Sequence, residues 1–322
     1  MIESIKLSRQ KDIDSYKPST SLEKTIEMAI ALGRPLLLAG KPGTGKTQFG
    51  HWFVNKRNDF NEVFQFNTKS TSLFNDLFYE YDAVSHFRDK EGLKEITDFI
   101  TLTAFGKAIL CAKGFNSITD PRLLKIAKNS DLDLEKVAPK SLVLIDEIDK
   151  APRDFPNDLL HEIENISFTI KETSPIIKVE LNDIQKENIV IILTSNDEKN
   201  LPDAFLRRCL FHYIEFPKEI ELKKIILNKL NEEELTEDEI KKIEDAEELE
   251  GFNGLNNKIE FFYKIFLSNS IEKKPHTSEC IDWINYLKKN NLLHLPIKEY
   301  KDTLSVLLKK DEDFKEALKM LD

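Results

Sequence analysis

Short apolar segments recur along the first two thirds of the chain, and stretches with helical spacing separate them. Five of these segments predict strands, because short aliphatic or alternating runs suit a sheet that is covered on both faces. They are residues 35–39, 63–67, 141–145, 189–193 and 211–216. Strands that alternate with helices indicate a parallel sheet wrapped by helices, so the expected fold class is α/β.

Local signals define a helix and a hairpin more closely. A helix is expected from Thr20, because Thr20 and Glu23 form a capping-box pattern, and it should end at Gly33, where left-handed backbone is common. Apolar and polar residues alternate over about 168–181 around the polar turn at 172–175, which predicts a β-hairpin.

The pattern is less regular between about 70 and 139, which we interpret as an insertion into the core fold. A helix is predicted around residues 73–78 and another at 121–129. After Pro217 only helical spacing remains. We therefore expect an N-terminal arm at 1–18, an α/β domain at 19–217 and a smaller all-helical domain at 218–322.

The segment between the first strand and the next helix carries a phosphate-binding pattern. Its sequence is Gly40-Lys41-Pro42-Gly43-Thr44-Gly45-Lys46-Thr47. The pattern alone also fits a glycine-rich surface turn, but the strand before it and the helix expected at 48–56 favour a nucleotide-binding loop. Glycines leave bare N–H groups for phosphate oxygens, Lys46 can reach the β- and γ-phosphates, and the Thr47 hydroxyl can hold Mg²⁺. The expected ligands are ATP and Mg²⁺.

Polar side chains follow two other predicted strands. Asp146 and Glu147 come directly after the run at 141–145, and Asn196 follows the run at 189–193. At the carboxyl edge of a parallel sheet, Asp146 can hold Mg²⁺ and Glu147 can act as general base toward water. Asn196 can orient that water, although a plain turn residue is an equally good interpretation.

Arginine is scarce, and two arginines are adjacent. Only eight of the 47 basic residues are arginine, and Arg207 and Arg208 are two of them. A surface ion pair would explain one arginine. A pair in a lysine-rich chain indicates that forked guanidinium geometry is needed, as when arginine neutralises a phosphoryl group in transit.

Composition excludes several classes of protein. The 322 residues are 40% hydrophobic and 32% charged, and no run approaches the roughly 18 apolar residues of a membrane span. The three isolated cysteines form neither a disulfide framework nor a metal-binding spacing. The expected location is cytoplasmic, with no membrane partner.

Most of the net charge of −10 comes from one stretch. Residues 232–250 hold eleven acids and two lysines, so the rest of the chain is nearly neutral. A nucleic-acid footprint would need a basic stripe. A nucleic-acid partner is therefore not expected.

The four motifs, in this order, resemble those of AAA+ ATPases, and most closely the MoxR-like family. Residues 34–47 resemble the family's first motif and 144–152 its second. Residues 194–196 resemble its sensor 1 motif, and 206–209 lie where its arginine finger stands. The resemblance covers about residues 20–290.

The resemblance implies a five-stranded AAA+ domain whose sensor 1 strand lies between the two Walker strands, followed by a helical lid. It implies a ring, usually hexameric, with ATP between subunits and a chaperone-like role toward a protein partner, often one with a von Willebrand factor A domain. It places a helix-2 insertion within 70–139 and a pore-facing hairpin at 168–181. Some similar proteins belong to bacterial conflict or phage-defence gene sets.

The chain departs from the family at two positions. Cys209 stands where phenylalanine commonly follows the finger, so Arg207 and Arg208 compete for that role, and position favours Arg208. No arginine follows Arg208, so Lys274 is the substitute for an arginine sensor 2.

Two other functions remain open from the sequence. One is a nucleic-acid motor or a restriction-type NTPase subunit, which would need a basic pore or an added DNA-binding domain. The other is a nucleotide-gated scaffold, against which the joint presence of Glu147, Asn196 and Arg208 argues.

Overall fold

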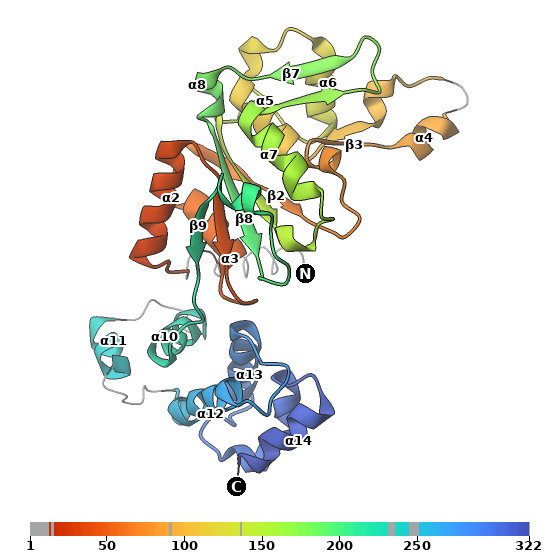
Figure 1. The fold of residues 1–322 in the computed structure, drawn as a ribbon. Helices are drawn as coiled ribbons and strands as arrows, with labels where there is room; N and C mark the ends of the chain where they lie inside the picture. The colour runs from red at the N-terminus through yellow and green to blue at the C-terminus, as the bar shows by residue number, and fades with distance from the viewer. Residues whose placement is uncertain are drawn as a thin grey trace. The chain divides into compact units, whose positions relative to one another are not determined.

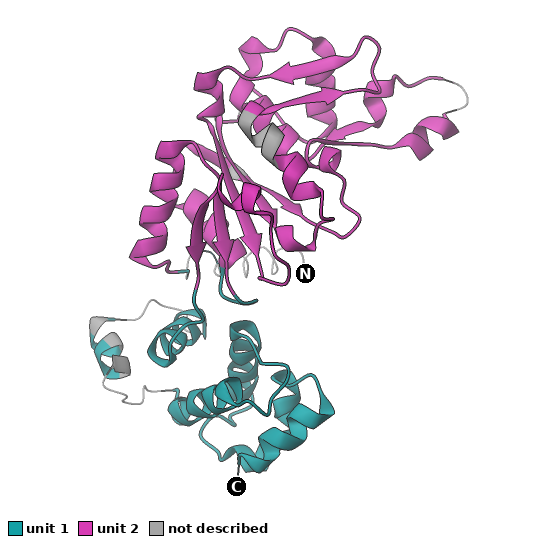
Figure 2. Cartoon of the chain, in the orientation of Figure 1, with its two compact units in different colours: residues 1–16, 41–45, 215–322 teal, residues 17–40, 46–214 magenta. Residues whose placement is uncertain are grey.

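The computed structural model describes residues 13, 16–89, 92–135, 137–230, 236–244 and 251–321. Most of the expected arm at 1–18 and about half of the acidic stretch at 232–250 therefore lie outside the described residues. The chain forms two compact units, shown in Figure 2. We call Lys17–Gly40 with Lys46–Ile214 the sheet unit, and Met1–Tyr16, Lys41–Gly45 and Glu215–Asp322 the helical unit.

A five-stranded sheet forms the centre of the sheet unit (Figure 1). All neighbouring strands are parallel and their order is β2-β5-β8-β1-β9. The strands are β1 (Leu36–Ala39), β2 (Phe60–Asn67), β5 (Lys140–Asp146), β8 (Ile189–Ser195) and β9 (Leu210–Tyr213). The five predicted strands are confirmed, and β8 lies between β5 and β1 as the family resemblance implies.

The last strand is shorter than expected. It was predicted at 211–216 but β9 ends at Tyr213, which pairs with Ala39, the last residue of β1. Only the N–H of Ile214 still reaches the Ala39 carbonyl, at 2.8 Å. The strand ends because its only neighbour in the sheet ends.

Helices cover both faces of this sheet. Leu142 and Leu144 of β5 face α3 (Lys46–Asn55), since a Cβ atom added at Gly50 of that helix would lie 3.5–3.6 Å from their side chains. The residues between them, Val143 and Ile145, belong to the hydrophobic core on the other face. This alternation follows from the two-residue period of a strand and explains why all four residues from Leu142 to Ile145 are apolar.

The second face is covered by the segment that the sequence pattern marked as an insertion. Its helix α5 packs on β2, β5 and β8, so part of this segment belongs to the core layer. Its elements are η1 (Phe74–Leu77), β3 (Tyr79–Tyr81), α4 (Ala83–Arg88), η2 (Ile96–Phe99), β4 (Ile100–Leu102), α5 (Ala104–Lys113), η3 (Phe115–Ser117) and α6 (Pro121–Asn129). The predicted helix at 121–129 is confirmed by α6.

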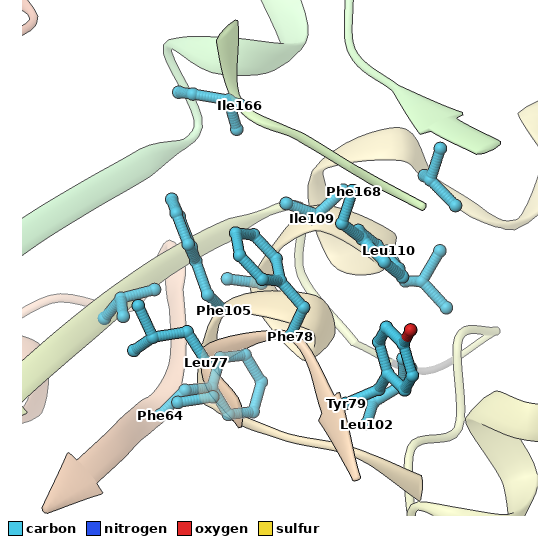
Figure 3. Packing of buried hydrophobic residues seen from close by; sticks show 14 of the residues in the cluster. Phe64, Leu77, Phe78, Tyr79, Leu102, Phe105, Ile109, Leu110, Ile166 and Phe168 are labelled. Atoms are coloured by element: carbon cyan, nitrogen blue, oxygen red, sulfur yellow. The ribbon is translucent and has the colours of Figure 1, made fainter. Parts of the chain in front are cut away.

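The helix expected around residues 73–78 is wrong. Phe74–Leu77 forms only a short 3-10 turn, capped where Asp76 accepts from the Leu73 N–H at 2.8 Å. The chain then enters β3, whose antiparallel pairing with β4 takes up the next backbone groups. The aromatic residues are core residues all the same: Phe78 stacks on Phe105 and on Phe168, with ring centroids 5.2 and 5.6 Å apart (Figure 3).

The predicted hairpin is confirmed. Strands β6 (Ser167–Ile170) and β7 (Ile177–Glu180) pair antiparallel. Phe168 and Val179 form a pair on the buried side of this hairpin, and Thr169 and Lys178 form the next pair on the other side. The remaining short elements of the unit are η4 (Ile148–Lys150), α7 (Phe155–Asn165), α8 (Asp183–Lys186) and α9 (Asp203–Leu206).

The first helix begins at Thr20, as predicted, but another residue caps it. In α2 (Thr20–Leu32) the cap is Ser19, whose hydroxyl accepts from the Leu22 N–H at 3.2 Å, so the prediction of Thr20 as the cap is wrong. Leu22, whose N–H donates to the Ser19 hydroxyl, lies three residues after Ser19, which is the spacing that a side-chain cap needs. Gly33 ends the helix with φ 61° in the left-handed region, as predicted.

The helical unit has its own core. Trp283, Phe262, Leu222 and Ile226 are fully buried in it. Its elements are α10 (Glu219–Leu230), α11 (Glu237–Glu244), α12 (Leu255–Leu267), α13 (Thr277–Lys289), η5 (Ile297–Val306) and α14 (Asp311–Lys319). Within the described ranges of both units, no helix is long and apolar enough to cross a bilayer.

Candidate active site

Lys46 is the first residue of α3, directly after the glycine-rich loop. Only 6% of its surface is exposed, and its Nζ donates to the Gly40 carbonyl at 2.6 Å. Burial lowers the pKa of Lys46, while the nearby Asp146 and Asp149 oppose that shift. The buried ammonium is thus held at the loop by backbone and carboxylates, where phosphate oxygens would compensate it.

Two glycines of the loop have backbone angles that other residues rarely adopt. Gly43 has φ +77° and Gly45 has φ +89°. A Cβ atom at Gly45 would lie 2.6 Å from the Tyr16 ring, and one at Gly43 would lie 3.1 Å from the Cβ of His276. Both contacts lie within the helical unit: a side chain at Gly45 would force the Tyr16 ring to move, and one at Gly43 would be a tight fit. Tyr16 had not been singled out as a site residue from the sequence.

Asp146 ends β5 beside the Thr47 hydroxyl. Thr47 Oγ1 donates to the two carboxylate oxygens at 2.9 and 3.1 Å. Thr194 Oγ1 of the adjacent strand β8 donates to Asp146 Oδ1 at 2.5 Å. The structure therefore brings Thr47 and Asp146 together, as the sequence predicted, and adds Thr194.

The Thr47 hydroxyl and the Asp146 carboxylate fit a magnesium ion. Mg²⁺ keeps several waters and takes one or two protein oxygens together with substrate phosphates. The Thr47 hydroxyl and the Asp146 carboxylate already lie within hydrogen-bond distance at the carboxyl edge of the sheet, beside the phosphate-binding loop. The donor set is thus of the right kind and number.

Glu147 is held by three neighbouring groups. Its backbone has φ 57° and ψ 51°, and its N–H donates to Thr194 Oγ1 at 2.8 Å. Asn196 Nδ2 donates to Glu147 Oε1 at 3.0 Å, and Lys150 Nζ lies 2.5 Å from Oε2. The hydrogen bond to Glu147 raises the pKa of Lys150. The structure thus brings Asn196 to the carboxylate that it was predicted to assist.

Asp149 fixes the turn that carries Asn196. It is 2% exposed, and its Oδ2 accepts from the N–H groups of Asn196 and Glu198 at 3.1 and 3.0 Å. A buried carboxylate that accepts two backbone donors sets the course of the chain after β8. The amide of Asn196 is directed at Glu147 as a consequence.

Lys274 precedes α13 in the helical unit. Its Nζ is shielded from solvent and has no hydrogen-bond partner among the described residues, and the same holds for Thr277 Oγ1. The first N–H groups of α13 lie close to the loop, since a Cβ atom at Gly43 would be 3.4 Å from the nitrogen of Thr277. Buried polar atoms of this kind usually have a partner, so both atoms suit a bound anion.

Arg207 and Arg208 lie at the opposite end of the sheet from the loop. They precede Leu210, which pairs with Leu36 at the start of β1, whereas the loop follows Ala39 at its end. About 10 Å of strand separates the two ends. Both side chains are exposed, and Arg208 Nη1 donates to the Ala204 carbonyl at 3.2 Å. The structure does not bring either arginine to the Lys46 site of the same chain.

Sequence reasoning also missed three residues around the carboxylates of this site. Thr194 and Lys150 were inside recognised motifs without a role of their own, and Asp149 was passed over beside Asp146 and Glu147. A hydroxyl at the end of an aliphatic strand was the signal for Thr194. Nothing in the pattern indicated which direction the Lys150 and Asp149 side chains take.

Comparison with known proteins gives one family and a set of distant folds. The family described as an AAA domain of the dynein-related subfamily matches residues 35–209, more than half of the chain. No curated protein matches the chain.

Two similar solved structures show how low the sequence identity is. A proposed ATPase from Cytophaga hutchinsonii ATCC 33406 is 14% identical with a TM-score of 0.41, over 98% of this chain and 88% of that chain. The FIGL-1 AAA domain in complex with ADP is 15% identical with a TM-score of 0.39, over 95% of this chain and 82% of that chain.

Proposed function

Because the chain belongs to the dynein-related subfamily of AAA domains and is thus an ATP-hydrolysing P-loop enzyme, we propose that it is a MoxR-like ATPase working as a ring. In this proposal ATP is hydrolysed between neighbouring subunits. The cycle remodels or activates a protein partner.

The phosphates of ATP are held by the loop and its neighbours. The loop residues are Gly40, Pro42, Gly43, Thr44, Gly45, Lys46 and Thr47. Lys46 supplies the buried positive charge, and Lys274 with the start of α13 supplies a second anion-binding contact in place of an arginine sensor 2. Thr47 and Asp146 hold Mg²⁺, which when bound neutralises charge on the phosphate oxygens.

Glu147 accepts the proton of the attacking water. Its carboxylate is anchored on one oxygen by Asn196 and on the other by Lys150, at 3.0 and 2.5 Å. Asn196 thereby keeps the base directed while it orients the water.

The position of the arginines carries the proposal of a ring. Arg207 and Arg208 are exposed at the far end of the sheet from the Lys46 site of their own chain. If either arginine stabilises the phosphoryl group during hydrolysis, it must therefore contact the nucleotide of a neighbouring subunit, as arginine fingers supplied in trans do. Arg208 is favoured by its place in the motif.

The partner is proposed from the family resemblance. MoxR-like ATPases act on protein clients, often together with a protein that has a von Willebrand factor A domain, and usually as hexamers. A role in bacterial conflict or phage defence belongs to the same proposal.

Mixing two inactive variants tests the arrangement between subunits. Lys46→Ala should fail to bind ATP, and Arg208→Ala should bind ATP but lose hydrolysis on the order of 10³-fold. In mixed rings an intact loop of one variant meets the intact arginine of the other. Phosphate release should therefore reappear on mixing, and Arg207→Ala in place of Arg208→Ala tells the two arginines apart.

Subunit exchange is the necessary control. It is followed by energy transfer between differently labelled subunits of the same two variants. If exchange is complete and neither arginine variant regains hydrolysis when mixed with Lys46→Ala, the proposal of a shared site is wrong.

A further inference from the structure

A cavity of about 620 Å³ lies in the sheet unit between the hairpin β6–β7 and the start of the inserted segment. We call it the hairpin cavity. Its walls are Phe74, Asn75, Phe78, Tyr79, Asn165, Ser167, Phe168, Thr169, Lys171, Lys178, Glu180, Leu181 and Lys186. None of these residues belongs to the phosphate-binding loop, to residues 146–150 or to residues 194–197, so the cavity is separate from the candidate active site.

One part of the cavity wall is aromatic. Phe78 and Phe168 are buried and stack on each other, and Phe74 meets Phe78 edge to face with ring centroids 5.1 Å apart. Figure 3 shows Phe78, Phe168 and Tyr79 next to one another at this place. Such a wall favours an apolar or aromatic group on the occupant.

Another part is positively charged. The wall holds Lys171, Lys178 and Lys186 and one acid, Glu180, on a chain whose net charge is −10. A second acid, Glu172, is next to the wall, where it accepts from the Tyr79 hydroxyl at 2.8 Å. Lys178 forms an ion pair with Glu180, and Lys186 lies 3.5 Å from the exposed Asp183. Lys171 forms no ion pair with any described residue. The ammonium group of Lys171 is therefore available to bind an anion in the cavity.

The kinds of residue in the wall favour carboxylates over phosphates. No arginine and no glycine is among the thirteen residues of the wall. Proteins usually grip phosphate with forked guanidinium groups or bare backbone N–H groups, whereas lysines act as flexible point charges. The cavity is also far larger than a single ion, and falls in the range of about 300–1,000 Å³ that takes organic ligands.

The rest of the wall suits a polypeptide. Asn75, Ser167 and Thr169 provide amide and hydroxyl groups for a peptide backbone. Ser167 and Thr169 lie on β6, so the hairpin presents extended backbone beside the cavity, while Asn75 lies on η1.

We propose that the hairpin cavity binds an acidic peptide segment that places at least one aromatic or large apolar side chain against Phe78 and Phe168. The proposal deepens the proposed function and rests on it for one point only, that the segment belongs to the protein partner. Binding itself needs neither ATP nor hydrolysis.

Short peptides test the chemistry. The full chain without nucleotide is titrated against Glu-Glu-Phe-Glu-Glu-Phe carrying an uncharged fluorophore, and binding is followed by fluorescence anisotropy. We expect the affinity to fall about tenfold or more when lysine replaces glutamate or alanine replaces phenylalanine, and to fall with added salt. Equal binding of the three peptides would overturn the proposal.

Variants test the place. Lys171→Ser with Lys186→Ser should weaken the peptide about tenfold, and Asn75→Trp, which fills the cavity without a change of charge, should weaken it at least as much. Lys24→Ser with Lys128→Ser removes the same charge from exposed helix positions and should leave the affinity unchanged. If the affinity depends only on the net charge of the variant, the proposal of an acidic-peptide site is wrong. It is also wrong if millimolar inorganic phosphate, at constant ionic strength, abolishes peptide binding.

The two proposals fail separately. Phosphate release is measured on the same samples, and the cavity variants should keep the basal rate, since none of them is in the candidate active site. If the peptides and variants behave as expected but the chain does not hydrolyse ATP, the peptide-binding proposal is supported and the proposed ATPase cycle is wrong. Normal hydrolysis without peptide binding removes the cavity proposal alone.

Discussion

Thr194 is the residue through which the acidic groups of the candidate active site are held together. Its hydroxyl donates to Asp146 at 2.5 Å and accepts from the N–H of Glu147 at 2.8 Å. The side chain is fully buried. One hydroxyl therefore orients the proposed magnesium ligand and the backbone of the proposed base.

Thr194→Val keeps the shape of this side chain and removes both hydrogen bonds. We expect kcat for ATP hydrolysis to fall about 10–100-fold, as when a group that orients a metal ligand is lost, while ATP affinity changes little. Steady-state kinetics and nucleotide titration separate the two effects.

Two variants control for a merely structural loss. Thr194→Ser retains the hydroxyl and should restore most of the rate. Ser195→Ala removes a neighbouring buried hydroxyl that accepts from the Asp197 N–H and, among the described residues, has no contact with Asp146 or Glu147, so kcat should stay within a few-fold of that of the natural protein. Equal kcat in Thr194→Val and Thr194→Ser would show that the hydroxyl has no such role.

At the scale of elements, the approach of α5 to the backbone of Phe78 depends on one glycine. A Cβ atom at Gly106 would lie 2.0 Å from the Phe78 carbonyl oxygen, which is backbone and cannot rotate away. The helix can thus pack this closely only with glycine at that position. Phe78 in turn stacks on Phe105 and Phe168, so the same contact locates one wall of the hairpin cavity.

Gly106→Ala should lower the free energy of unfolding by about 2 kcal/mol or more, because α5 and the backbone of Phe78 must move apart. Gly50→Ala is the matched control, since its Cβ would meet leucine side chains at an ordinary 3.5–3.6 Å. Alanine is the better helix former, so that variant should be neutral or more stable by up to about 1 kcal/mol. Midpoints of urea unfolding measure both, and an unchanged midpoint for Gly106→Ala would contradict the packing described.

At the scale of the whole molecule, the proposed shared site couples nucleotide binding to assembly. Glu147→Gln keeps the contact with Asn196 within reach but cannot accept a proton from water, so ATP should remain bound between subunits. We expect mass photometry to show larger particles of this variant with ATP and magnesium than without nucleotide.

Two further samples make the assembly prediction specific. Lys46→Ala should stay at the nucleotide-free size, because its loop is empty. Magnesium chelation should return Glu147→Gln to the same size. Particles of one size in every sample would argue against an interface built around ATP.

The sequence by itself determined the strands and the chemistry of the loop. Period and composition act within a few residues, so the segments 35–39 and 141–145 and the pattern Gly40–Thr47 carry their structure locally. The same holds for Gly33, whose left-handed angle is a property of one residue. Asp146, Glu147 and Asn196 were predicted at one sheet edge because parallel strands bring their carboxyl ends together.

Only the tertiary structure decided what crosses from one element to another. The end of β9 depends on where β1 stops, and the 3-10 turn at Phe74–Leu77 depends on the pairing of β3 with β4. Thr194, Lys150 and Asp149 acquire roles through partners on other strands and turns, and the hairpin cavity is enclosed by segments about 90 residues apart in sequence. Hydrogen bonds and packing of this kind depend on which elements come into contact. The spacing of apolar and polar residues along the chain does not contain that information.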